Sequence, residues 1–116
     1  MERILEVAVD SLASARAAIA GGADRLELCS ALAVRGLTPY AELLQQIRRE
    51  STISIRCLMR PRGGDFLYTD EEIALMAAQM DNLRKHGADG FVIGCLNAEG
   101  ELDAGAMAPL LKAAKG

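Results

Sequence analysis

Two arginines and two adjacent glycines fall in one short polar segment of this 116-residue chain, between residues 60 and 68. Adjacent glycines let a backbone adopt positive φ and approach a ligand closely, and arginine guanidinium groups match the geometry of carboxylates and phosphates. Because binding residues concentrate in loops held by a rigid scaffold, we predict that the segment binds a small anionic ligand. The alternative is an ordinary turn whose arginines are only solvated. The residues of the candidate site are Arg60, with Arg62, Gly63, Gly64, Asp65 and Tyr68 as ligand-binding residues beside Phe66.

Charged residues also occur inside segments that are typical of β-strands. Strand side chains alternate between two faces, and the apolar positions mark the face that packs on helices. This alternation places Glu6, Glu27, Arg56 and Arg60 on the opposite, concave face. Since an unpaired buried ion is costly, we predict that at least one carboxylate pairs with Arg60. Glu6, Glu27 and Arg60 are therefore candidate catalytic residues, with the carboxylates as acid and base; a structural ion network is the alternative.

Cys29 follows Glu27 on the same face and is the candidate metal ligand, because a thiolate binds a soft ion such as Cu(I). The alternative is a small buried hydrophobic residue. Cys57 and Cys95 are predicted to face the helices, so no second thiol converges on Cys29. Three widely separated cysteines predict a reducing cytoplasm rather than a disulfide framework.

Four apolar strand-like segments alternate with four helical patterns. The strands are predicted at residues 4–9, 25–29, 53–59 and 91–96, and the helices at 11–20, 39–49, 70–86 and 104–115. Thr38 followed by Pro39 is a helix-start signal, and Thr69 with Glu72 forms a capping-box pattern. A Gly-Ala-Asp repeat, at residues 22–24 and 87–89, joins a helix end to a strand start. The alternation predicts an α/β fold with parallel strands, a (βα)₄ half of a TIM barrel, as a single domain over residues 1–116.

The composition argues against some classes of partner. A formal net charge of −3 and only four aromatic residues do not suit a general nucleic-acid binder. The first residues lack the apolar core of a signal peptide, and no apolar run has the length of a membrane span. We therefore expect no nucleic-acid or membrane partner.

The motifs together resemble the CutC family of copper homeostasis proteins, from residue 6 to the last predicted helix. The resemblance rests on Glu6-Val-Ala-Val-Asp-Ser11, Gly21-Gly-Ala-Asp-Arg-Leu-Glu-Leu-Cys29, Gly36-Leu-Thr-Pro39, Arg60-Pro-Arg-Gly-Gly-Asp-Phe66 with Tyr68, and Gly87-Ala-Asp-Gly90. It implies a cytosolic TIM-barrel protein linked to copper, with Glu6, Glu27 and the segment 60–66 lining the barrel mouth, and copper ligation by cysteines on early strands.

The chain departs from the family pattern. Ala8 stands where many members carry a cysteine, Val34-Arg35 replaces an acidic residue and a glycine, and a family barrel has about eight strands against the four predicted here. The sequence therefore leaves open copper(I) binding, an enzyme of unknown reaction acting on a small anion, and an inactive fragment. Because four parallel strands have two open edges, we also expect a homodimer that rebuilds an eight-stranded barrel.

Overall fold

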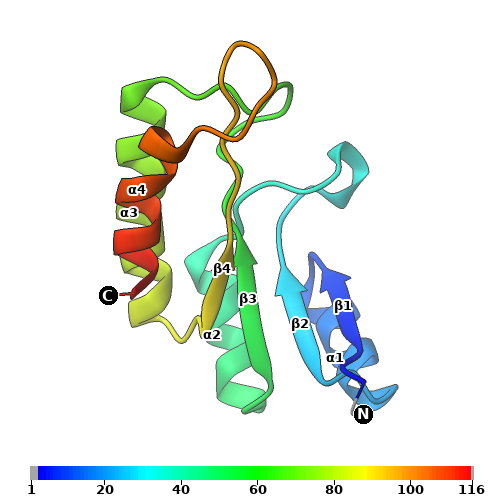
Figure 1. Cartoon of the computed structure of the whole chain (residues 1–116). Helices are drawn as coiled ribbons and strands as arrows, with labels where there is room; N and C mark the ends of the chain where they lie inside the picture. The colour runs from blue at the N-terminus through cyan, green and yellow to red at the C-terminus, as the bar shows by residue number, and fades with distance from the viewer. Residues whose placement is uncertain (1–2, 116) are drawn as a thin grey trace.

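The computed structural model describes residues 3–115 and contains one four-stranded parallel sheet in the order β1-β2-β3-β4 (Figure 1). The strands are β1 (Glu6–Val9), β2 (Arg25–Leu28), β3 (Ser54–Leu58) and β4 (Gly90–Val92). The helices are α1 (Leu12–Ala20), α2 (Ala41–Glu50), α3 (Asp70–Lys85) and α4 (Ala104–Lys115), with a 3₁₀ turn, η1 (Leu32–Val34), after β2. In Figure 1 the helices lie behind and to the left of the sheet, so one sheet face carries no helix. The predicted α/β half-barrel is confirmed.

Alternation along the strands separates the core from the concave face, as predicted. Leu26, Leu28 and Ile55 are fully buried on the helix side, whereas Glu27 is half-buried and Arg56 is exposed. The register pairs Leu26 with Ile55 and Glu27 with Arg56, so the side chains of each pair lie on the same face. The helix side holds the main hydrophobic core, to which α2 and α3 contribute Leu44, Ile47, Met76 and Met80.

Most predicted element boundaries differ from the observed ones by one or two residues, and two differences involve identifiable contacts. Helix α2 begins at Ala41 after Tyr40, not at Pro39, because the Thr38 hydroxyl accepts a hydrogen bond from the backbone N–H of Arg60 at 2.9 Å instead of capping the helix. The last strand ends at Val92 rather than at residue 96, and Leu96 instead forms an isolated bridge with Leu102. The predicted capping box of α3 is present, with Thr69 and Glu72 each bonded to the other's backbone N–H.

The Gly-Ala-Asp repeat has the same local structure at both places. Gly22 and Gly87 have φ of 98° and 112°, which allows the chain to turn out of the preceding helix. In the first copy, Asp24 Oδ2 accepts from the backbone N–H of Leu5 at 2.8 Å. In the second, Asp89 Oδ2 accepts from Ile55 N–H at 2.9 Å. Each aspartate therefore fixes its strand against the start of the neighbouring strand.

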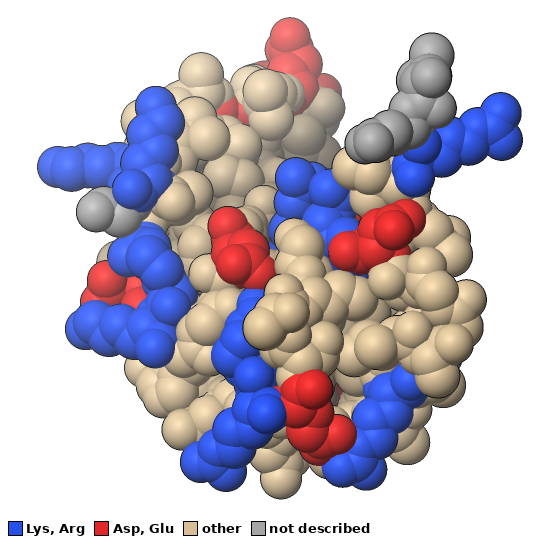
Figure 2. All heavy atoms as spheres, turned by 90° about the horizontal axis from the view of Figure 1, so that it is seen from below, with Lys and Arg blue, Asp and Glu red and all other residues tan. Residues whose placement is uncertain are grey.

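The face at the N-terminal ends of the strands carries acidic and basic side chains side by side (Figure 2). No extended patch of one sign is visible on this face. Among residues 3–115, no helix is both long enough and apolar enough to span a membrane.

Candidate functional site

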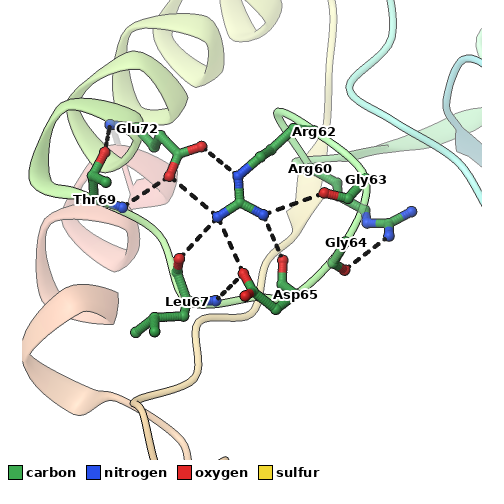
Figure 3. A network of polar contacts seen from close by, with 8 residues as sticks. All are labelled: Arg60, Arg62, Gly63, Gly64, Asp65, Leu67, Thr69 and Glu72. Atoms are coloured by element: carbon green, nitrogen blue, oxygen red, sulfur yellow. Dashed lines mark hydrogen bonds and ion pairs between the residues drawn. The ribbon is translucent and has the colours of Figure 1, made fainter.

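Arg60 lies just beyond the C-terminal end of β3, where two loops meet over its guanidinium group. The residue is only 9% exposed. Its Nη1 donates to the carbonyls of Val34 at 2.9 Å and Gly36 at 3.1 Å, both from the β2–α2 loop. Its Nη2 donates to the Gly64 carbonyl at 3.3 Å in the β3–α3 loop (Figure 3). The guanidinium carbon also lies 5.4 Å from the centre of the Phe66 ring.

Arg60 has no carboxylate within ion-pair distance among residues 3–115, and its buried Nε has no hydrogen-bond acceptor there. The prediction that a carboxylate would pair with Arg60 is therefore wrong. The strand register gives the reason. Glu27 lies opposite Arg56 on the neighbouring strand, and Arg60 lies four residues beyond Arg56, which corresponds to about 13 Å along a strand. The alternation of side chains predicts which face of the sheet a residue lies on, but not its position along the strand direction.

The carboxylates of the concave face form a separate group lower in the sheet. Glu6 is bound by Arg25, which neighbours it on β2. The hydrogen bond from Arg25 is the main reason that the pKa of Glu6 lies below its ordinary value. Glu27 has its pKa raised, first by burial and then by the nearby Glu6 carboxylate. The sequence did not single out Arg25, although its position opposite Glu6 in a parallel register makes it the natural partner.

Arg62 is fully engaged within its own loop and the start of α3 (Figure 3). Its Nε and Nη2 bind the two carboxylate oxygens of Glu72, at 2.6 and 3.3 Å. Nη1 donates to the carbonyls of Gly63 at 3.3 Å and Asp65 at 2.9 Å, and Nη2 donates to Leu67 O at 2.8 Å. All three guanidinium nitrogens thus already have acceptors within the chain. Arg62 therefore has no free nitrogen with which to bind a ligand.

The remaining residues predicted to bind ligand surround these arginines. Gly63, Gly64 and Asp65 are exposed, and Gly64 has φ of 90°, a value that glycine adopts without strain. The Asp65 carboxylate pairs with Arg62 at 3.2 Å. The Tyr68 ring lies 5.0 Å from the Arg62 guanidinium carbon, and its buried hydroxyl has no partner among the described residues. Burial is the main cause of the raised pKa of Tyr68.

Cys29 is buried, 1% exposed, and lies outside the main helix-side core, whereas Cys57 and Cys95 belong to that core, as predicted. Its Sγ lies 3.5 Å from the Val9 carbonyl. Gly36 covers it closely, since a Cβ built on Gly36 would lie 3.5 Å from Sγ and 2.9 Å from a Leu58 methyl carbon.

Burial, with smaller effects of Asp10 and Glu27, raises the pKa of the Cys29 thiol to about 11. The described residues contain no group of three or more His, Cys, Asp or Glu side chains able to hold a metal ion. A single thiol does not satisfy Cu(I), which prefers several sulfur ligands. The residues present around Cys29 therefore do not fit a copper ion.

The fold and site define a class: a (βα) half-barrel with a buried arginine at the C-terminal ends of its strands. A model of the CutC family matches residues 3–116, and the chain belongs to this family. It is 54% identical over 96 residues to the copper homeostasis protein cutC homolog of Drosophila melanogaster and 47% identical over 100 residues to that of Homo sapiens. These matches cover 82% and 86% of this chain, but only 36% and 37% of the two relatives.

The structural comparison gives the same family. A crystal structure of CutC from Streptococcus agalactiae superposes with a TM-score of 0.88 at 30% sequence identity. The match covers 98% of this chain and 56% of the solved one. The chain therefore spans less than two thirds of the length of these relatives.

Proposed function

We propose that this chain provides four βα units of a CutC-type barrel and that its mouth binds a small anion through Arg60. The observation that carries the proposal is the buried Arg60 guanidinium, which has an unbonded Nε and no carboxylate partner within the described residues. Three backbone carbonyl oxygens accept hydrogen bonds from Arg60, but they are neutral and do not balance its positive charge. A buried ion without a counter-ion is costly, and an anion entering at the mouth would supply one.

The competing role for Arg60 is structural, because its carbonyl partners join the β2–α2 and β3–α3 loops. If Arg60 only joins the two loops, these hydrogen bonds are sufficient, and added anions should not stabilise the folded chain. The two roles therefore differ in one measurable respect, which is whether a small anion stabilises the folded chain through Arg60.

The test measures thermal unfolding with and without inorganic phosphate or sulfate, for the wild type and for Arg60→Met. A ligand that binds only the folded state, at about a hundred times its dissociation constant, adds roughly 2.7 kcal/mol. We expect the anion-dependent shift in the wild type and its loss in Arg60→Met. Arg49→Met is the matched control, because Arg49 is exposed on α2 and its removal changes the net charge equally. No shift with any small anion, or a shift that survives in Arg60→Met, would overturn the proposal.

Proton transfer by Glu6 or Glu27 is the enzymatic form of the same proposal. Burial and the nearby Glu6 raise the pKa of Glu27, which is the direction of shift expected of a carboxyl group that transfers a proton. Its height in the sheet separates it from Arg60, so only an extended ligand would contact both. The activity of the whole protein also involves parts of the longer relatives that this chain does not cover.

Copper(I) binding is the second candidate, supported by the family and by the names of its relatives. Cys29 is the candidate ligand, and we expect weak binding or none, because one thiolate rarely satisfies Cu(I) alone. Titration with Cu(I) against a coloured chelator tests this. Stoichiometric binding abolished by Cys29→Ser would establish copper at this residue, and tight binding that survives the substitution would place the metal elsewhere. The three free, buried cysteines suit a reducing compartment such as the cytoplasm.

The proposal includes assembly with a second copy of the chain. Strand β1 pairs only with β2, and β4 only with β3, within the described sheet. Two copies related by a two-fold axis along the barrel would join β1 of each to β4 of the other in parallel.

A further inference from the structure

We propose that Arg62 is a positioning residue for Arg60, acting through the peptide groups of the Gly63–Gly64 loop and anchored by Glu72. This inference rests on the proposed anion site and reassigns Arg62, which the sequence placed among the residues that contact the ligand. The ion pair of Arg62 with Glu72 would fix the loop, and the loop in turn would fix the guanidinium of Arg60 at the mouth.

The directions of successive carbonyls carry the argument. The carbonyls of Gly63 and Asp65 accept from Arg62, whereas the intervening Gly64 carbonyl accepts from Arg60 (Figure 3). Because the Gly63 and Asp65 carbonyls both point toward Arg62, the Gly64 carbonyl between them points in the opposite direction, toward Arg60. The positive φ of Gly64 permits this reversal. Arg62 thus orients the Gly64 carbonyl, which is one of the three acceptors of Arg60.

A second connection runs through the aromatic rings. Arg60 stacks over Phe66 and Arg62 stacks over Tyr68, and the two rings meet edge to face with centroids 6.3 Å apart. The rings and the carbonyls lie on the same short segment, so a shift of Arg62 would move the two contacts that Arg60 makes within it, with the Gly64 carbonyl and the Phe66 ring.

Glu72 provides the rigid end of this connection. Its Oε1 accepts from the Thr69 backbone N–H at 2.9 Å, and its own N–H donates to the Thr69 hydroxyl at 3.1 Å. The carboxylate is therefore held at the first turn of α3 while it binds Arg62 in a bidentate manner. Bidentate arginine–carboxylate pairs impose a defined orientation on both groups.

Glu72→Gln separates positioning from direct ligand contact by the sign of its effect. If Arg62 contacted the anion, removing its carboxylate partner would leave phosphate binding unchanged or tighter. If Arg62 positions Arg60, the loop loosens and phosphate affinity falls, roughly fivefold or more for coupling of ordinary size. Arg62→Met should weaken binding similarly, and Arg62→Lys should recover only part of the loss, because lysine cannot bind in a fork.

The matched control is the bidentate pair of Arg16 with Glu50, whose bonds of 2.8 and 2.7 Å join α1 to α2. Glu50→Gln removes the same kind of ion pair and should leave phosphate affinity unchanged. Phosphate titrations are made by calorimetry well below the unfolding temperature of each variant. Equal or tighter binding in Glu72→Gln, or an equal loss in Glu50→Gln, would overturn the positioning role.

A readout without ligand keeps this inference separate from the proposed function. In ¹⁵N-labelled protein, the Arg60 Nε–H and Gly64 amide signals should shift in Glu72→Gln and not in Glu50→Gln. If the wild type binds no anion, the proposed function fails while these signals still report on the coupling. If anion binding through Arg60 is present and neither signal moves in Glu72→Gln, the positioning role alone is wrong.

Discussion

Thr38 and Arg60 exchange two hydrogen bonds that join the end of β3 to the β2–α2 loop. The backbone N–H of Thr38 donates to the Arg60 carbonyl at 3.0 Å, and the backbone N–H of Arg60 donates to the Thr38 hydroxyl at 2.9 Å. These bonds replace a sheet ladder where the strand has already ended. They place Arg60 beneath the same loop that supplies the Val34 and Gly36 carbonyls.

Thr38→Val should destabilise the chain, because it keeps the side-chain shape and leaves the Arg60 N–H without an acceptor. The expected loss is about 1–3 kcal/mol, the cost of an unsatisfied buried donor. Urea unfolding measures it. Thr52→Val is the control, since Thr52 is exposed and its hydroxyl has no hydrogen bond among the described residues. An equal effect of both substitutions would contradict a specific role for the Thr38 hydroxyl.

The two aspartates of the repeat should differ in their contribution to stability. Asp89→Ala removes the acceptor of the Ile55 N–H and also the 2.7 Å ion pair with Arg48, for an expected loss of about 2–3 kcal/mol. Asp24→Ala removes only the more exposed bond to Leu5 N–H, where water can substitute, for about 1 kcal/mol or less. Urea unfolding of both variants gives the comparison, and an equal or reversed order would contradict it.

Much of the fold could be predicted because the local signals are consistent with one another. The alternation of Leu26 and Leu28 with Glu27 gave the correct faces, and the capping box of Thr69 gave the correct start of α3. The predicted start of α2 was wrong because the Thr38 hydroxyl forms a long-range hydrogen bond with the backbone N–H of Arg60 instead of capping the helix. Helix propensity and capping patterns describe only interactions between residues close in sequence. They do not indicate which distant residue will form a hydrogen bond with a side chain such as that of Thr38.

The carboxylates of Glu6 and Glu27 should affect stability with opposite pH dependence. The pKa of Glu6 is lowered in the folded chain, so its stabilising contribution is lost as the pH falls below the ordinary value of 4.5. The pKa of Glu27 is raised, so folded stability is lost as the pH rises above 4.5 through its folded pKa. Glu27→Gln should therefore raise the urea midpoint at pH 7, with a gain that shrinks toward pH 4.

Glu6→Gln should lower the urea midpoint at pH 7 instead, because it removes a favourably placed charge beside Arg25. Glu99→Gln, at an exposed loop position, is the control for the change of net charge. If both Glu6→Gln and Glu27→Gln shift the midpoint in the same direction, the two carboxylates do not have the opposed environments described here.

The sequence singled out the residues of the segment 60–68, but it did not indicate how they pair with one another. In the structure, the segment from Arg60 to Tyr68 forms one connected network of hydrogen bonds and ring contacts. Its internal pairing was not predictable, because the choice of Glu72 as the partner of Arg62 depends on where the loop meets α3. The carboxylates of the concave face were assigned to the right face but to the wrong height.

The last prediction concerns the uncovered face and the two open strand edges. Ala8 and Arg56 are exposed on the concave face and Leu58 is only half-buried, so apolar and charged groups share a surface without a covering layer. Parallel sheets are normally covered on both faces, and unpaired edges such as those of β1 and β4 favour pairing with another chain. We therefore expect the 116-residue chain to sediment at micromolar concentration as a homodimer, or to aggregate. Arg56→Glu should weaken such a dimer, because it would place a third acidic group near Glu6 and Glu27, whereas Arg49→Glu on the outer face of α2 should not. A compact, cooperatively unfolding monomer would contradict the proposed assembly and would mean that the concave face is stable in water.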